Sequence, residues 1–243
     1  MAKLSVNLNK VALLRNTRTI GIPSVVGAAR ICIDAGAHGI TVHPRPDQRH
    51  IRPGDVDDLA EVLRDHPQVE LNIEGNPYPE FLALVRRVKP TQCTLVPDSP
   101  DAFTSDHGWD LAADAGRLKP LVAELRALGS RVSLFMDAEA DGIGRAADVG
   151  ADRIELYTEP YAAAHARGDC QGELARFTAA AGAAQAAGLG VNAGHDLNLD
   201  NLVEFRHIPG LLELSIGHAL IADALELGLY GAVRAYLRVL RTS

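Results

Sequence analysis

The stretch RVSLFMDAEADGIGRAADVGADRIELY, residues 131–157, contains one complete strand–helix–strand unit. Its two ends, Arg131–Met136 and Arg153–Tyr157, are short apolar runs of the kind that form buried strands. Gly150 stands between them at a point where a helix ends and a strand begins, which is typical of a helix C-cap. This stretch therefore predicts two parallel strands joined through a helix.

The same unit recurs along the whole chain. Gly36 and Gly129 take the place that Gly150 has here, and Ala179–Ala187 is predicted to be a helix that stops at Gly188. Six more apolar runs are predicted strands: Leu4–Leu8, Gly39–His43, Val69–Ile73, Gln92–Val96, Gly190–Asn192 and Leu212–Ile216. Eight such units in 243 residues, with no linker and no GxGxxG after the first strand, favour a single (β/α)8 TIM barrel with residues 1–243 as one catalytic domain. A doubly wound open sheet is the alternative.

Composition limits the classes of partner. The net charge is −7 and aromatic residues make up only 5% of the chain, so nucleic acid and anionic membranes are not expected partners. No apolar run reaches the roughly 18 residues that a membrane span needs. Three scattered cysteines indicate reduced thiols and a cytoplasmic protein. Local phosphate binding remains compatible with this charge, because an arginine or amide pocket can override the global field.

Polar and titratable residues gather where the predicted strands end, which is where a barrel carries its chemistry. His43, Glu74 and His195 end three different strands and are candidate acid–base groups. Each also has a structural interpretation, as a hydrogen-bonding histidine, a solvated loop carboxylate and a turn residue, but their conjunction favours catalysis. His43, Glu74 and His195 are scattered singly along the chain together with Glu155 and His218, so a metal site is not favoured.

Two segments are candidate phosphate sites. The arginine-rich stretch after the second strand contains Arg45, Arg49, His50 and Arg52, although a solvated basic loop would look the same. The other candidate is the helix N-terminus that opens at Gly217-His218 after the eighth strand. Arg15 and Arg18 after the first strand are expected to add positive charge.

Several segments, taken in order, resemble the pyridoxine 5′-phosphate synthase family from about residue 4 to residue 240. They are VNLNKVALLRNTR, GITVHPRPDQRHI, LNIE, LVPD, VSLFMDA, VNAGHDL and ELSIGHALI. The resemblance implies a barrel with extra helices that assembles as a homo-octamer. It also implies condensation of 1-deoxy-D-xylulose 5-phosphate with 3-amino-2-oxopropyl phosphate, giving pyridoxine 5′-phosphate, phosphate and water, without cofactor or metal.

The resemblance also implies residue roles. His43 and Glu74 match the family's bases, and His195 matches its acid. The irregular segment 97–108 is similar to a mobile lid. The substrate contacts that the resemblance implies are Asn7, Gly217 and His218 for the amino-ketone phosphate, Arg45, His50 and Thr104 for the deoxyxylulose phosphate, and Arg18 near the first strand.

The chain departs from the family's pattern at three positions that contact substrate. Asn9-Lys10 stand where the family usually has Asp-His, and Asp196 follows His195 where the family usually has Gly. Asn9 can still hydrogen-bond a hydroxyl and Lys10 can pair with a phosphate. Lys10 also motivates a different hypothesis, a barrel aldolase or isomerase that forms a Schiff base on a related sugar phosphate. A third hypothesis is a phosphate-ligand binding protein without catalysis.

Overall fold

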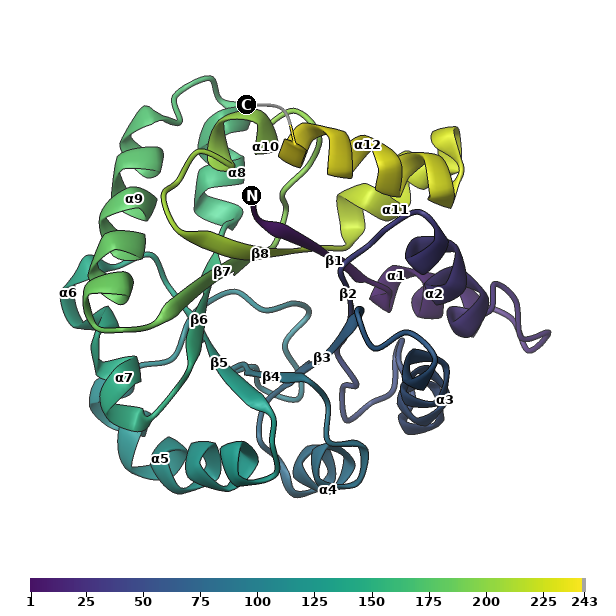
Figure 1. Cartoon of the computed structure of the whole chain (residues 1–243), viewed down its shortest axis with the longest axis horizontal. Coiled ribbons are helices and arrows are strands. Elements are labelled where there is room, and N and C mark those ends of the chain that lie inside the picture. Colours follow the sequence, from purple (N-terminus) through teal and green to yellow (C-terminus); the bar gives the residue numbers. More distant parts are fainter. Residues whose placement is uncertain (242–243) are drawn as a thin grey trace.

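The computed structural model describes residues 1–241. Its centre is a closed barrel of parallel strands in the order β1 to β8, with β8 pairing back onto β1. Figure 1 shows the helices arranged as a ring outside these strands. The strands are β1 (Lys3–Asn7), β2 (Gly39–Val42), β3 (Glu70–Gly75), β4 (Gln92–Leu95), β5 (Arg131–Met136), β6 (Arg153–Tyr157), β7 (Gly190–Gly194) and β8 (Leu211–Ile216).

The predicted barrel is therefore confirmed, and so are the extra helices. Three of the connections between strands, β1–β2, β5–β6 and β6–β7, each carry two helices, and two more follow β8. The helices are α1 (Asn9–Asn16), α2 (Val25–Asp34), α3 (Pro53–Arg64), α4 (Pro79–Val88), α5 (Leu111–Ala127), α6 (Ala140–Ile143), α7 (Arg145–Val149), α8 (Glu159–Ala166), α9 (Gln171–Ala186), α10 (Leu202–Phe205), α11 (His218–Leu227) and α12 (Leu229–Arg241).

The hydrophobic core lies between the strands and the helices. Outward-facing strand residues such as Leu4, Ile40 and Leu134 are fully buried in one apolar cluster with the helices. The C-terminal helix α12 packs against α2, α11 and β1, so its apolar face covers the barrel. Burial of this apolar layer is the main stabilising contribution to the fold.

The inside of the barrel is polar, unlike the layers of branched aliphatic side chains usual in this fold. Ser5 and Thr41 share a hydrogen bond of 2.7 Å, and Gln92 on β4 donates to Glu213 on the facing strand β8 at 3.1 Å. Because neighbouring residues of a strand point to opposite faces, each strand presents apolar side chains outward and polar ones inward. Most of these inward residues are buried and hydrogen-bond to one another, so polar and charged groups lie inside the barrel; the buried hydroxyl of Ser133 has no partner within the described chain.

The irregular segment 97–108 crosses the C-terminal end of the barrel without forming a helix or strand. Its far end is fixed, because the indole of Trp109 donates to the Leu95 carbonyl at 2.8 Å. Gly108 packs so closely on β5 that a Cβ there would lie 2.2 Å from the backbone nitrogen of Asp137. The segment therefore has one anchored end and an exposed middle, where Phe103 is 90% exposed.

Candidate functional site

A cavity of about 490 Å³ opens at the C-terminal ends of the strands. Side chains from the ends of β1, β2, β3, β6, β7 and β8 line it, together with the segment 97–108. The structure brings nearly all predicted site residues together here: Asn7, Asn9, Lys10, His43, Arg45, His50, Glu74, Thr104, His195, Asp196, Gly217 and His218.

Arg18 is the predicted site residue that the cavity does not include. It is exposed in the segment between α1 and α2, which projects from the barrel at the right of Figure 1. Arg15 was expected to add charge to the site, but it is buried and bound elsewhere. Its guanidinium pairs with Asp55 on α3 and donates to the His50 carbonyl at 3.1 Å. Arg15 therefore fixes the loop after β2 from behind.

His43 is buried directly after β2 and is held through its backbone. Its N–H donates to the Asn9 side chain at 2.9 Å, and the N–H of Asn9 donates to the Asn7 side chain at the same distance. Burial lowers the pKa of His43 well below its usual value, and the neighbouring basic groups Arg45, His50 and Arg49 lower it further. His43 is consequently neutral at physiological pH and can accept a proton.

Glu74 on β3 is buried with weak hydrogen bonds only. Asn72 and Ser215 donate to its Oε1 at 3.4 and 3.5 Å. Burial raises the pKa of Glu74 well above its usual value, and the nearby carboxylates of Glu155, Asp98 and Glu213 raise it further. A raised pKa makes the ionised carboxylate of Glu74 a stronger base than a solvated glutamate.

Glu155 is a second inward carboxylate of the cavity that the sequence did not single out as catalytic. Burial and the charge of Glu213 raise its pKa to about 8. A Cβ at Gly194 would lie 2.5 Å from its Oε1, so only glycine fits there on β7. The alternation of strand residues could have identified Glu155, since it lies on the same face of β6 as Arg153, which points into the barrel.

His195 follows β7 in a strained backbone conformation. His195 and Asp196 both have positive φ, at 93° and 58°. The ring of His195 lies edge-on to Tyr157 at 5.0 Å, and its two nitrogens are both in contact: Nδ1 with the Asp196 carboxylate at 3.0 Å and Nε2 with the Thr104 hydroxyl at 3.0 Å. The hydrogen bond from His195 lowers the pKa of Asp196. Asp196 thus orients the imidazole, and Thr104 brings the segment 97–108 onto it.

The arginines after β2 contact that segment as well. Nη1 of Arg45 donates to the Ala102 carbonyl at 3.0 Å, and Nη1 of Arg49 donates to the Ala102 and Phe103 carbonyls, both at 3.1 Å. Burial and the charges of Arg45, Arg49 and Lys10 lower the pKa of His50 to about 4. Its Nδ1 accepts from the Ile51 N–H at 2.9 Å, so the neutral ring carries its proton on Nε2 and is a hydrogen-bond donor toward an anion.

The other candidate anion site is at the end of β8. Gly217 is the N-cap of the ten-residue helix α11, and Gly217 and His218 both line the cavity. A Cβ at Gly217 would lie 3.0 Å from Cβ of Asn7, so β1 and α11 approach closely at this position. Free backbone N–H groups at a helix N-terminus favour an anionic group such as phosphate.

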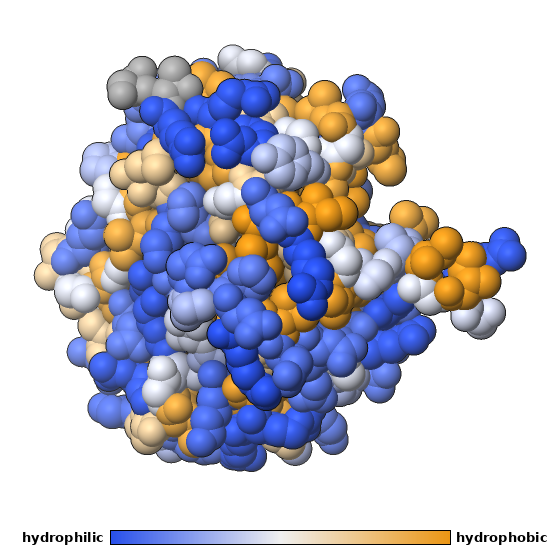
Figure 2. All heavy atoms as spheres, turned by 45° about the vertical axis from the view of Figure 1, so that its right-hand side comes forward, coloured by the Kyte–Doolittle hydropathy of each residue, from blue (hydrophilic) through white to orange (hydrophobic). Residues whose placement is uncertain are grey.

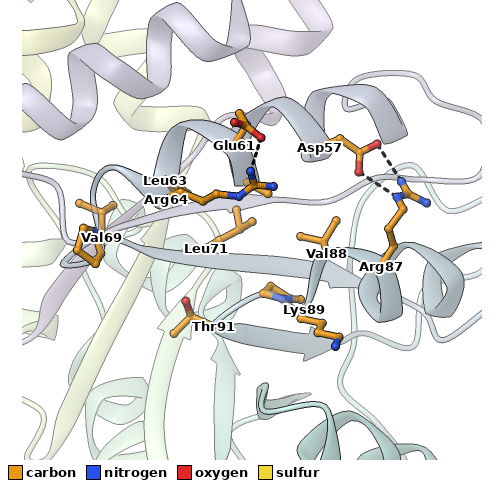
Figure 3. A pocket seen from close by; sticks show the side chains of 13 residues that line it. Asp57, Glu61, Leu63, Arg64, Val69, Leu71, Arg87, Val88, Lys89 and Thr91 are labelled. Atoms are coloured by element: carbon orange, nitrogen blue, oxygen red, sulfur yellow. Dashed lines mark hydrogen bonds and ion pairs between the residues drawn. The ribbon is translucent and has the colours of Figure 1, made fainter.

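A second hollow, of about 430 Å³, lies between α3 and α4 and contains no predicted site residue. Figure 3 shows two ion pairs among its charged side chains, Arg87 with Asp57 at 2.9 Å and Arg64 with Glu61 at 2.7 Å. Among residues 1–241 no three His, Cys, Asp or Glu side chains are grouped so as to hold a metal ion. In the same range no helix is long and apolar enough to cross a membrane.

Solved structures with this fold include two enzymes at low identity. One is a 4-hydroxy-2-oxoglutarate aldolase/2-deydro-3-deoxyphosphogluconate aldolase from TTHB1, with a TM-score of 0.64 and 16% identity, covering 98% of this chain and 94% of that one. The other is phosphoribosyl anthranilate isomerase from Thermus thermophilus, with a TM-score of 0.59 and 15% identity, covering 98% of each chain. At these identities the likeness shows the barrel fold alone.

The sequence relatives are much closer. A pyridoxine 5'-phosphate synthase of Albidiferax ferrireducens is 59% identical over 242 residues, covering 97% of this chain and 96% of the relative. One of Xanthomonas axonopodis pv. citri is 58% identical over 248 residues, covering 99% and 97%. Residues 4–242 match the family described as Pyridoxal phosphate biosynthesis protein PdxJ. This chain therefore belongs to the PdxJ family.

Proposed function

We propose that this chain is a pyridoxine 5′-phosphate synthase of vitamin B6 biosynthesis. It condenses 1-deoxy-D-xylulose 5-phosphate with 3-amino-2-oxopropyl phosphate and releases phosphate and water. The observation that supports this most directly is the convergence of His43, Glu74 and His195 on one cavity. The synthase name of the relatives at 58–59% identity supports the same reaction.

The proposed chemistry needs several proton transfers at one place. The amine of one substrate attacks the ketone of the other and water leaves, the deoxyxylulose part then eliminates its phosphate, and carbon–carbon bond formation with a further loss of water closes the ring. His43 and Glu74 take protons from substrate and His195 donates one to a leaving group. This division fits the surroundings described above, in which His43 is neutral and the pKa of Glu74 is raised. Neither a cofactor nor a metal is needed for these steps.

Two separate anion sites hold the two phosphates in this proposal. Arg45, His50 and Thr104 bind the deoxyxylulose phosphate, with Asn9, Lys10 and Asp196 nearby in the same cavity. Asn7, Gly217 and His218 bind the amino-ketone phosphate at the start of α11. Binding both substrates in one cavity makes the condensation effectively intramolecular.

We further propose that the enzyme is a cytoplasmic homo-octamer. Exposed apolar side chains gather on the face formed by α1, α2, α11 and α12, which is turned toward the viewer in Figure 2. They are Leu13, Leu14, Ile20, Ile22, Ile31, Leu225, Leu227 and Tyr230. Exposed apolar side chains that gather on neighbouring helices in this way are typical of a protein interface. Arg18, on the projecting segment, would then contact substrate only in a neighbouring subunit. Light scattering that gives the mass of a monomer would contradict the assembly.

The test of the reaction is a ring-closure assay with both phosphorylated substrates, in which pyridoxine 5′-phosphate and released phosphate are quantified. His195→Asn should abolish product formation, with a loss of at least about 100-fold, because the proposed acid is removed. The variant should keep the native unfolding temperature, since His195 is at the cavity surface.

Full activity of His195→Asn would remove the assignment of the acid. No product from folded native protein would contradict the synthase proposal itself. In that case borohydride trapping of a substrate on Lys10 would test the aldolase alternative, which the names of the relatives do not favour. Tight binding of phosphorylated ligands without turnover would instead indicate the non-catalytic alternative.

A further inference from the structure

Asp98 is a buried carboxylate next to the cavity but not part of its lining. It lies three residues after the end of β4 at Leu95 and is only 4% exposed. Its backbone carbonyl accepts from the Asn76 side chain at 3.0 Å and from the Tyr78 hydroxyl at 3.1 Å. Residues of the connection between β3 and α4 therefore fix the position of Asp98.

The carboxylate of Asp98 contacts two residues that face the substrate cavity. Its Oδ2 accepts from Nη2 of Arg45 at 2.5 Å and lies 3.8 Å from Nε2 of His43. The Ser105 hydroxyl donates to the same oxygen at 2.8 Å. Asp98 thus lies behind His43 and Arg45, where all three line a separate hollow of about 420 Å³.

One oxygen of the Asp98 carboxylate can still accept a hydrogen bond. Its Oδ1 is buried and has no hydrogen-bond partner within the described chain. A buried carboxylate oxygen without a donor is costly, and such atoms are rare without a reason. A proton that arrived on the neighbouring imidazole would give this carboxylate a second positive partner.

The charges around His43 are otherwise unfavourable for a proton. Arg45, Arg49 and His50 come from its own loop, and Lys10 lines the cavity beside it. Glu74 lines the same cavity from β3. Within residues 1–241, Asp98 is the only carboxylate in ion-pair distance of the His43 ring.

We propose that Asp98 is a positioning residue that holds the Arg45 guanidinium at the cavity and supplies the counter-charge when His43 takes up a proton. The proposal rests on the proposed function, in which His43 is a base. When substrate loses a proton to His43, the imidazolium forms beside the Asp98 carboxylate. Asp98 does not take the proton, which His43 returns to a later intermediate. A carboxylate that orients and stabilises a histidine in this way is a common catalytic arrangement.

The test is Asp98→Asn, which keeps an oxygen for Arg45 and removes the charge. We expect kcat to fall by about 10- to 100-fold, because His43 loses its counter-charge. The KM for the sugar phosphate should not rise. The affinity for inorganic phosphate, measured by calorimetry, should stay the same or increase, because Arg45 no longer shares its charge with Asp98.

Asp98→Glu should restore most of kcat. Asp101→Asn removes an exposed carboxylate of the same segment and should behave as native.

A merely structural role predicts a different result. In that case Asp98→Asn would lose kcat and phosphate affinity together, and Asp98→Glu would not rescue. Unchanged kcat in Asp98→Asn would also overturn the proposal.

If Asp98→Asn does not fold, the pair Arg45→Gln/Asp98→Asn removes both charges and is compared with Arg45→Gln alone. We expect kcat of the pair to be about tenfold lower, whereas equal kcat would overturn the role at His43. If native protein binds phosphate without ring closure, the synthase proposal fails, and the phosphate affinities still test the contact between Asp98 and Arg45.

Discussion

Two carboxylates on β3, four residues apart and on the same inward face, have opposite surroundings. Glu70 is at the N-terminal end of the barrel and Glu74 is roughly 13 Å along the strand at the C-terminal end. Glu70 is paired with Lys3 at 2.7 Å and with Arg131, whereas Glu74 has no cation in contact among the described residues. One strand therefore carries a neutralised carboxylate at one end and an uncompensated one at the other.

The pKa values of these two groups shift in opposite directions. Burial alone would raise the pKa of Glu70, but hydrogen bonds from Lys3 and Arg131 more than offset it, and the pKa is lowered. Burial raises the pKa of Glu74, and neighbouring carboxylates add to the effect. An ion pair holds Glu70 in its charged form, which helps the fold, whereas Glu74 is kept ready to exchange a proton at some cost to stability.

The largest expected effect separates these two residues. Glu74→Gln should reduce ring closure by at least about 100-fold and raise stability at pH 7. Above the unfolded pKa of 4.5, folded Glu74 retains a proton that the unfolded chain has lost, and this penalty disappears in glutamine. Glu70→Gln should leave activity nearly unchanged and lower stability by about 1 kcal/mol above pH 4.5, where its ion pairs form. Assays and denaturant unfolding of both variants check this, and equal effects on both would break the comparison.

Glu155 is also a buried carboxylate with a raised pKa, and we expect its cost to stability to depend on pH. Its pKa is raised from 4.5 to about 8, so between these values the folded protein holds a proton that the unfolded chain does not. Stability of the native protein should therefore fall as pH rises from 4.5 to 8 and level off above that. Glu155→Gln should flatten the slope, with a gain of up to roughly 4 to 5 kcal/mol by pH 8. Unfolding at pH 5 and pH 8 measures it, and Glu226→Gln, at an exposed position, should follow the native curve.

The smallest expected effect concerns the residue that departs from the family's pattern. Asn9 accepts the His43 N–H through its side-chain oxygen, and aspartate can accept it equally well. Asn9→Asp should therefore keep kcat within about threefold. Asn9→Ala removes the acceptor and should lower kcat by about fivefold, which corresponds to one hydrogen bond of about 1 kcal/mol. A greater loss in Asn9→Asp than in Asn9→Ala would indicate that charge at this position, and not the hydrogen bond, matters.

The sequence predicted the barrel well because its strands are short, apolar and separated by glycine-capped helices. Arg131–Met136 and Arg153–Tyr157 have the predicted bounds. β7 was predicted to stop at Asn192 but continues to Gly194, because Ala193 and Gly194 pair with β6. Alanine and glycine show no alternation of apolar and polar side chains, so the sequence did not indicate these two residues as strand. Their pairing with β6 determines where β7 ends.

The site was predictable as far as it follows from strand ends. His43, Glu74 and His195 each end or follow a strand, and the barrel alone brings them together. The contact between Thr104 and His195 depends on how an irregular segment folds over the mouth, which no periodic pattern encodes. The roles of Asp98 and Arg15 depend on which residue each side chain pairs with, and three-dimensional packing determines that partner.

The polar inside of the barrel has a consequence for how this protein can change over time. The apolar layer outside the strands stabilises the fold, whereas inward positions such as Thr94 and Ser133 are fully buried but lie outside that hydrophobic cluster. A change between polar side chains of similar size there alters hydrogen bonding inside the barrel while the strands keep their outward residues. The barrel thus separates the positions that maintain the fold from those that set the chemistry of its interior, and alternate residues of a single strand belong to different sets.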